Sequence, residues 1–227
     1  MRSINLTPEK NATRSVGVYV DDNYKKLGVE LSEFINSYVD VTRDQWLDFD
    51  RLVEESTVFM FVRNPYSRLV SSFVHVCLSE DYLKWYPKWY FKLPIDKDNQ
   101  LECFKNFCKD FAKTGVDNQH VKLQTKTIDE HVTLGLPKID NFSIIPYIEN
   151  KKIFIGKIDG NGGIEKNIDK LSSLIFDSNP PVKFDTWIGN NTHVKFSADY
   201  RDWYDDELYN LITPIFEEEL RIFDYGF

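Results

Sequence analysis

The sequence has few of the residues that build disulfide frameworks or metal centres. Its 227 residues include only three cysteines and four histidines. Cys77, Cys103 and Cys108 are odd in number and form no Cys-x-x-Cys pair, so we expect free thiols in a reducing compartment. The histidines show no metal-ligand spacing, so no metal is expected.

Long apolar runs and an excess of positive charge are also missing. No run of about 18 apolar residues is present, so no membrane-spanning helix is expected. Residues 1–15 contain no apolar signal core, which favours a cytoplasmic location. The formal net charge of −8 argues against a nucleic acid partner, which basic surfaces normally bind. A phosphate ligand would therefore need a local basic pocket.

The residues that are present suit one well-packed domain. The 42% hydrophobic content of 227 residues is enough for one core and short for two, and no repeat or linker interrupts it. We therefore expect a single domain over residues 1–227.

Strand and helix patterns alternate along the chain. Apolar runs predict strands, weakly at 2–7 and strongly at 57–62 and 151–158. Apolar residues at helical spacing predict helices that begin near 11 and cover 31–39, 65–77, 101–113, 164–176 and 205–223. Pro214 is expected to kink or break the last helix. This order predicts an α/β fold with a parallel sheet between helices, and ligands beyond the carboxyl ends of its strands.

One turn between a strand and a helix concentrates basic and hydroxyl groups. In VFMFVRNPYSRLVSSF (58–73), Asn64 is a good N-cap and Pro65 fits the first helical turn. Arg63 leaves the strand end, and Ser71 lies two turns into the helix. Together these two side chains suit one phosphate, because the arginine fork matches phosphate oxygens. The alternative is a surface helix with an arginine–carboxylate ion pair and ordinary serines.

A second such turn lies near the N-terminus, in TPEKNATRSV (7–16). Lys10 sits at the junction, and Thr13 and Ser15 follow inside the coming helix. A helix start attracts anions through free N–H groups and its dipole. The Walker pattern GxxxxGK[ST] is absent. The alternative is that these side chains only cap the helix and keep it soluble.

Both turns resemble a known family. Residues 58–73 resemble the 3′-phosphate-binding motif of sulfotransferases, most closely the R-[DN]-P-x-x-R-[LF]-x-S pattern of the carbohydrate sulfotransferase branch. Residues 8–16 are similar to that family's 5′-phosphosulfate loop, P-K-x-[AG]-x-[TS]-S, except that Glu9 precedes the lysine and Arg14 replaces a small or hydroxyl residue. Fainter likenesses cover DNQHVKLQ (117–124), 152–171 and 216–227.

The resemblance implies a P-loop-like three-layer domain, with a central parallel sheet flanked by helices, that binds 3′-phosphoadenosine 5′-phosphosulfate (PAPS) without a metal. The protein would move the sulfuryl group to a hydroxyl of a carbohydrate or small molecule. Lys10 would hold the 5′-phosphosulfate and assist the leaving phosphate, while Arg63 and Ser71 would hold the 3′-phosphate. The rest of the implied 5′ cradle is Asn11, Ala12, Thr13, Arg14 and Ser15.

The general base is not fixed by the resemblance. Relatives often carry a histidine in a His-x-Thr segment between the two phosphate motifs, but residues 16–62 contain none. Asp40, in the segment DVT, and His120 are the candidates for this base. A structural role is the alternative for each.

An aromatic segment, YLKWYPKWYFK (82–92), follows the second motif. Its Trp85, Tyr86, Trp89 and Tyr90 suit stacking on an acceptor, or packing as a lid or oligomer contact. Three functions remain: a sulfotransferase, a non-catalytic binder of PAPS or its 3′,5′-bisphosphate product, and a kinase-like phosphotransferase. The missing Walker pattern and the lack of an acidic magnesium motif count against the third.

Overall fold

The computed structural model describes residues 2–8, 13–30, 33–75, 96, 98–114, 120–135, 139, 141–159, 163–176, 180, 182–184 and 199–227. The chain divides into two compact units. The first unit contains Met1–Arg63 and Gln124–Asn190, and the second contains Asn64–Leu123 and Asn191–Phe227. That residues 1–227 act as a single domain stays a prediction.

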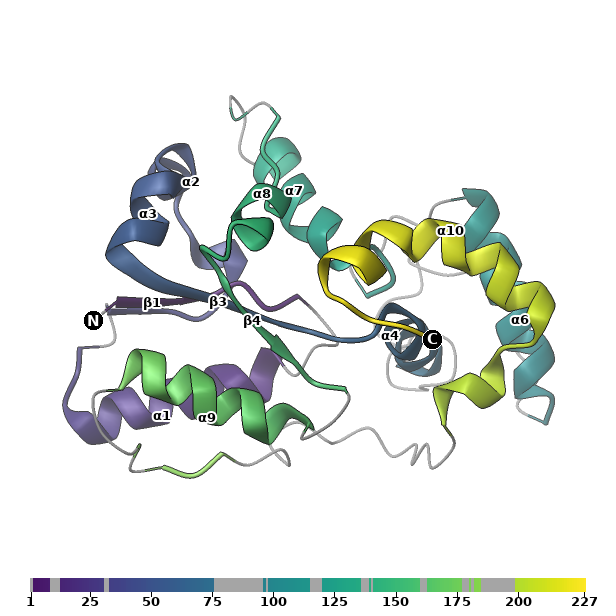
Figure 1. Ribbon diagram of the computed structural model, residues 1–227, viewed down its shortest axis with the longest axis horizontal. Coiled ribbons are helices and arrows are strands. Elements are labelled where there is room, and N and C mark those ends of the chain that lie inside the picture. The colour runs from purple at the N-terminus through teal and green to yellow at the C-terminus, as the bar shows by residue number, and fades with distance from the viewer. Residues whose placement is uncertain are drawn as a thin grey trace. The chain divides into compact units, whose positions relative to one another are not determined.

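The first unit is built on a four-stranded parallel sheet (Figure 1). Its strands are β1 (Arg2–Asn5), β2 (Phe34–Ile35), β3 (Ser56–Val62) and β4 (Phe154–Lys157), in the order β2-β1-β3-β4. In the β1–β3 register Asn5 lies opposite Phe59, and in the β3–β4 register Val62 lies opposite Lys157. All carboxyl ends therefore share one edge of the sheet, which we call the carboxyl edge.

Helices cover both faces of this sheet. Figure 1 shows α1 (Thr13–Leu27) and α9 (Gly163–Ile175) on one face and α2 (Arg43–Leu47), α3 (Phe49–Glu55) and α8 (Ile145–Glu149) on the other. Phe59 and Phe61 pack into the core that α1 and α9 form. Because strand side chains alternate between faces, Met60 faces the opposite layer, and it is also fully buried. The predicted three-layer α/β fold is confirmed.

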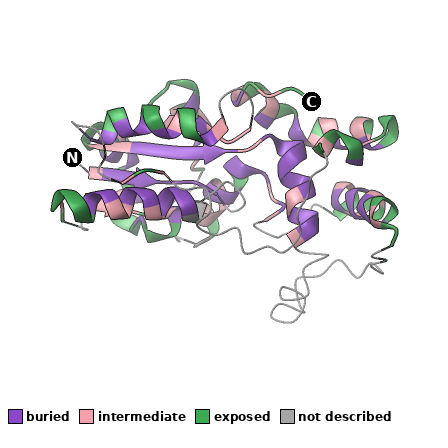
Figure 2. Ribbon diagram, turned by 90° about the horizontal axis from the view of Figure 1, so that it is seen from below, coloured by how far each residue is buried: buried purple, intermediate pink, exposed green. Residues whose placement is uncertain are grey.

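Burial follows this layering. In Figure 2 the long strand of the sheet is buried over most of its length, and the helices beside it expose their outer faces. The remaining elements of the first unit are the 3₁₀ turn η2 (Tyr38–Asp40) and α7 (Gln124–Gly135). None of the described helices combines the length and the apolar character that a membrane span requires.

The second unit is helical and rich in aromatic side chains. It contains α4 (Pro65–Phe73), α6 (Gln100–Thr114), the 3₁₀ turn η4 (Tyr200–Trp203) and α10 (Asp206–Ile222). Phe73 lies at the centre of its core, with the ring centroids of Phe104 and Phe107 both 5.3 Å away. Such a core buries large apolar areas and fixes the relative positions of these helices.

One expected helix was wrong, and of the kink or break expected at Pro214 only the break is contradicted. Residues 31–39 are not a helix, because Phe34 and Ile35 form β2 and pair with Ser3 and Ile4 of β1. The apolar residues at 34, 35 and 38 fit helical spacing, but the first two form an edge strand of the sheet instead. The last helix is not broken either: α10 continues through Pro214.

Candidate functional site

The strand order creates a reversal point within the first unit. From β1 the chain goes to β2 on one side, whereas from β3 it goes to β4 on the other. The loops that leave β1 and β3 therefore diverge at the carboxyl edge. In parallel α/β sheets this divergence leaves a crevice in which ligands bind.

The chain that leaves β1 is fixed by buried polar side chains. Asn5 Oδ1 accepts a hydrogen bond from the Thr7 N–H (3.0 Å), and Thr7 Oγ1 accepts one from the Phe61 N–H (2.9 Å). Both side chains are fully buried. Thr7 thus satisfies a β3 backbone donor and ties the start of the 7–16 segment to the reversal point.

The helix that follows begins close to the same edge. Adding a Cβ at Gly17 of α1 would place it 2.1 Å from Asn36 Oδ1, just beyond the carboxyl end of β2, so glycine allows this close approach. Ser15 lies buried in the first turn, and Thr13 and Arg14 begin the helix. The N-terminus of α1 therefore brings backbone N–H groups and a positive dipole end to the carboxyl edge. Lys10, Asn11 and Ala12 lie outside the described residues.

Arg63 is the first residue beyond β3, and it is held at two places. Its N–H donates to Gln124 Oε1 (2.9 Å) and its carbonyl accepts from Gln124 Nε2 (3.1 Å). Its Nε lies 3.6 Å from Asp159 Oδ1, two residues past the end of β4. The Arg63 side chain keeps 27% of its surface exposed. The arginine–carboxylate ion pair is thus present, and the Arg63 side chain is partly exposed at the carboxyl edge.

The other groups of the 58–73 motif have structural partners in the second unit. Asn64 Oδ1 caps α4 through the Tyr66 N–H (3.0 Å), and its Nδ2 donates to the Gly226 carbonyl (2.7 Å). The buried Arg68 donates to the Lys122 carbonyl (2.6 Å), and the Ser72 hydroxyl donates to the His120 carbonyl. These three side chains therefore hold neighbouring backbone in place.

Comparison with known proteins decides the family. A family model described as the sulfotransferase family matches residues 22–226. The chain belongs to the sulfotransferase family. Neither the curated proteins nor the solved structures gave a match. The matched region contains Arg63, Gln124 and Asp159 and begins after the 8–16 segment.

The remaining predicted site residues of this sulfotransferase-family chain lie in separate places. Asp40 is exposed at the end of η2 in the first unit. Ser71 and His120 are half-buried in the second unit, where the His120 ring lies 5.3 Å from that of His75. The roles of all three stay predictions. The four aromatic residues singled out in 82–92 lie outside the described residues.

Sequence reasoning assigned no role to Gln124 or Asp159. Gln124 ends the segment 117–124 that resembles the family, and Asp159 follows a strongly predicted strand. Because β3 and β4 are neighbours, their ends bring Asp159 to Arg63. A search for polar residues just beyond each predicted strand would have found Asp159, but not Gln124, which opens a helix.

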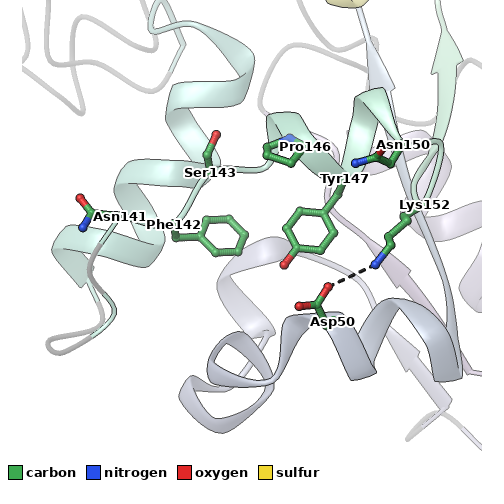
Figure 3. A pocket seen from close by; sticks show the side chains of 8 residues that line it. All are labelled: Asp50, Asn141, Phe142, Ser143, Pro146, Tyr147, Asn150 and Lys152. Atoms are coloured by element: carbon green, nitrogen blue, oxygen red, sulfur yellow. Dashed lines mark hydrogen bonds and ion pairs between the residues drawn. The ribbon is translucent and has the colours of Figure 1, made fainter.

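A cavity of about 370 Å³ lies elsewhere in the first unit (Figure 3). Phe142 and Tyr147 line it, and Lys152 Nζ pairs with Asp50 Oδ1 at 3.2 Å. Burial and the Asp50 carboxylate raise the pKa of Tyr147, so its hydroxyl keeps its proton at neutral pH. Lys152 precedes β4, so the cavity is at the end of the strand opposite the carboxyl edge. With its lysine already paired, this cavity is a poor phosphate site.

Proposed function

We propose that this chain transfers the sulfuryl group of PAPS to a hydroxyl of a carbohydrate or small-molecule acceptor. The observation that carries the proposal is the family match over residues 22–226, which includes the arginine at the carboxyl edge. Membership of the family supports sulfuryl transfer in general. The donor and the acceptor class are our proposal.

The residues at the carboxyl edge fit a donor with two anionic ends. Arg63 offers a partly exposed planar fork for the 3′-phosphate. The N-terminus of α1 offers N–H groups for the 5′-phosphosulfate. By the family resemblance, Lys10 would add a positive charge to this end of the donor. Thr13, Arg14 and Ser15 would complete this cradle. Ser71 would assist Arg63 at the 3′-phosphate.

The bound donor supplies an activated sulfuryl group. In the transfer the acceptor oxygen forms a bond to sulfur while the bond from sulfur to the phosphate oxygen breaks. The electron pair stays on that phosphate oxygen, where Lys10 would stabilise the growing charge. The acceptor proton would pass to Asp40 or His120. By analogy with phosphoryl transfer, the protein acts mainly by positioning and electrostatics.

Calorimetric titration with adenosine 3′,5′-bisphosphate tests the donor site. We expect the wild type to bind it more tightly than ATP, and Arg63→Ala to lose most of that affinity. Arg51→Ala is the matched control, because it removes a carboxylate-paired arginine from α3 in the same unit. Equal binding to wild type and Arg63→Ala would remove Arg63 from the site, and no binding to the wild type would overturn the proposed donor.

A non-catalytic binding protein is the second candidate. Two features of the sequence favour it: Glu9 and Arg14 alter the first loop, and no histidine occurs within residues 16–62. Incubation with sulfur-labelled PAPS and a panel of sugars, phenols and alcohols separates the two functions. Label transferred to any acceptor establishes the enzyme, whereas tight bisphosphate binding without transfer across the panel supports the binding protein.

A further inference from the structure

Gln124 makes an unusual pair of contacts with Arg63. It is the first residue of α7 and is fully buried, although it is polar. Its side-chain amide accepts from the Arg63 N–H and donates to the Arg63 carbonyl, across 61 residues of sequence. The amide therefore binds the Arg63 main chain as a neighbouring strand would.

This contact lies where the regular ladder of β3 ends. The last backbone bond on the β4 side joins the Ile158 N–H to the Val62 carbonyl (3.0 Å). At the next residue, Arg63, the Gln124 side chain supplies the hydrogen-bond partners of both the N–H and the carbonyl. Buried backbone groups need such partners, and an apolar side chain at 124 would remove two hydrogen bonds at once. Gln124 thus helps to fix the position of the Arg63 backbone.

We propose that Gln124 is a positioning residue for the 3′-phosphate of the donor, acting through the Arg63 backbone. This inference rests on the proposed function. A guanidinium binds phosphate well only when its fork meets the oxygens in the right plane. Gln124 holds the backbone from which the Arg63 side chain extends, and Asp159, two residues beyond β4, contacts the guanidinium. The expected result is selectivity for nucleotides that carry a 3′-phosphate.

Another buried amide side chain, that of Asn23, serves as a matched control, because it also bonds the N–H and the carbonyl of one distant residue. Asn23 is also fully buried, accepts from the Val182 N–H (2.8 Å) and donates to the Val182 carbonyl (3.2 Å). It lies in the middle of α1 in the same unit, away from the helix N-terminus. Gln124→Met and Asn23→Leu each replace, by an apolar side chain, a buried amide that bonds both the N–H and the carbonyl of one distant residue; Asn23 also donates to the Tyr19 carbonyl (2.9 Å). Only the first change concerns Arg63.

The test compares adenosine 3′,5′-bisphosphate with adenosine 5′-monophosphate by calorimetry. We expect Gln124→Met to lower bisphosphate affinity about tenfold, because a displaced Arg63 guanidinium loses charge-assisted hydrogen bonds to the 3′-phosphate. The affinity for the monophosphate should be unchanged. Asn23→Leu should change neither affinity. In an Arg63→Ala background, Gln124→Met should have no further effect on bisphosphate binding, because coupled residues are not additive.

The outcomes separate this inference from the proposed function. If the wild type binds no bisphosphate, the proposed function fails. If it binds and Gln124→Met keeps both affinities, or loses both equally, the positioning role is wrong. Should Gln124→Met not fold, Gln124→Glu keeps the acceptor for the Arg63 N–H and loses the donor. The same selective loss is expected there, and unchanged selectivity overturns the inference.

Discussion

At the scale of single residues, Asp159 lies beside Arg63, the proposed phosphate ligand. Its carboxylate lies 3.6 Å from the guanidinium and would repel a phosphate bound there. We expect Asp159→Asn to bind adenosine 3′,5′-bisphosphate more tightly, by roughly threefold to tenfold, since a like charge near the ligand is removed. Calorimetry measures this directly. Weaker binding would mean that Asp159 chiefly orients Arg63.

Lys10 is the residue with the strongest expected effect on rate. We expect Lys10→Ala to lower the turnover rate by about 10²–10³, the usual cost of losing one donor to a charge that develops in the transition state. Lys26→Ala, in the last turn of α1, is the control. Steady-state kinetics on a working acceptor gives the answer, and an unchanged rate would remove Lys10 from the mechanism.

His131 links the stability of the first unit to pH. Burial lowers its pKa below the ordinary value of 6.5, and its ring packs edge-on against Tyr38 with centroids 5.2 Å apart. Below pH 6.5 the unfolded chain therefore binds more protons at this residue than the folded chain. The free energy of unfolding should fall as the pH drops from 6.5 through the lowered pKa. Urea denaturation at pH 7.5 and 5 should show a smaller fall for His131→Phe than for the wild type.

At the scale of elements, the β3–β4 pair depends on a glycine. A Cβ added at Gly156 would lie 2.6 Å from the ring of Phe61, which is fully buried. We expect Gly156→Ala to lower the free energy of unfolding by about 1–3 kcal/mol, the usual cost of overpacking. Gly226→Ala is the control, because nothing lies near its added Cβ. Equal denaturation midpoints for the two variants would contradict this account.

The elements also show what the sequence predicts and what it does not. The apolar run 57–62 identified β3 because a strand covered on both faces needs no polar alternation. Phe34 and Ile35 were misread because two residues carry no period of their own and only pairing with β1 makes them a strand. Arg63 was predicted as a site residue from its place after a strand. The contact of Gln124 with Arg63 spans 61 residues, and no local pattern indicates it.

At the scale of the whole molecule, ligand binding should raise thermal stability. A ligand that binds only the folded state at a hundred times its dissociation constant stabilises by about 2.7 kcal/mol. For a chain of this size that corresponds to a rise in Tm of roughly 5–10 °C. We expect this rise with adenosine 3′,5′-bisphosphate for the wild type but not for Arg63→Ala. Scanning calorimetry with and without the nucleotide measures it, and a similar rise in both proteins would place the binding energy elsewhere.

The side chains of residues 63–72 have different roles, and this difference matters when related sequences are compared. Asn64, Arg68 and Ser72 donate hydrogen bonds to neighbouring backbone carbonyls, a role that needs no ligand. Arg63 is the member of this segment that directly follows β3 at the carboxyl edge, and its side chain is partly exposed. If Arg63 binds the donor as proposed, a relative that keeps the first three residues but lacks the arginine would retain these backbone contacts and lose a contact to the donor. On that proposal, the residue at the position of Arg63 reports on donor binding better than the rest of the segment does.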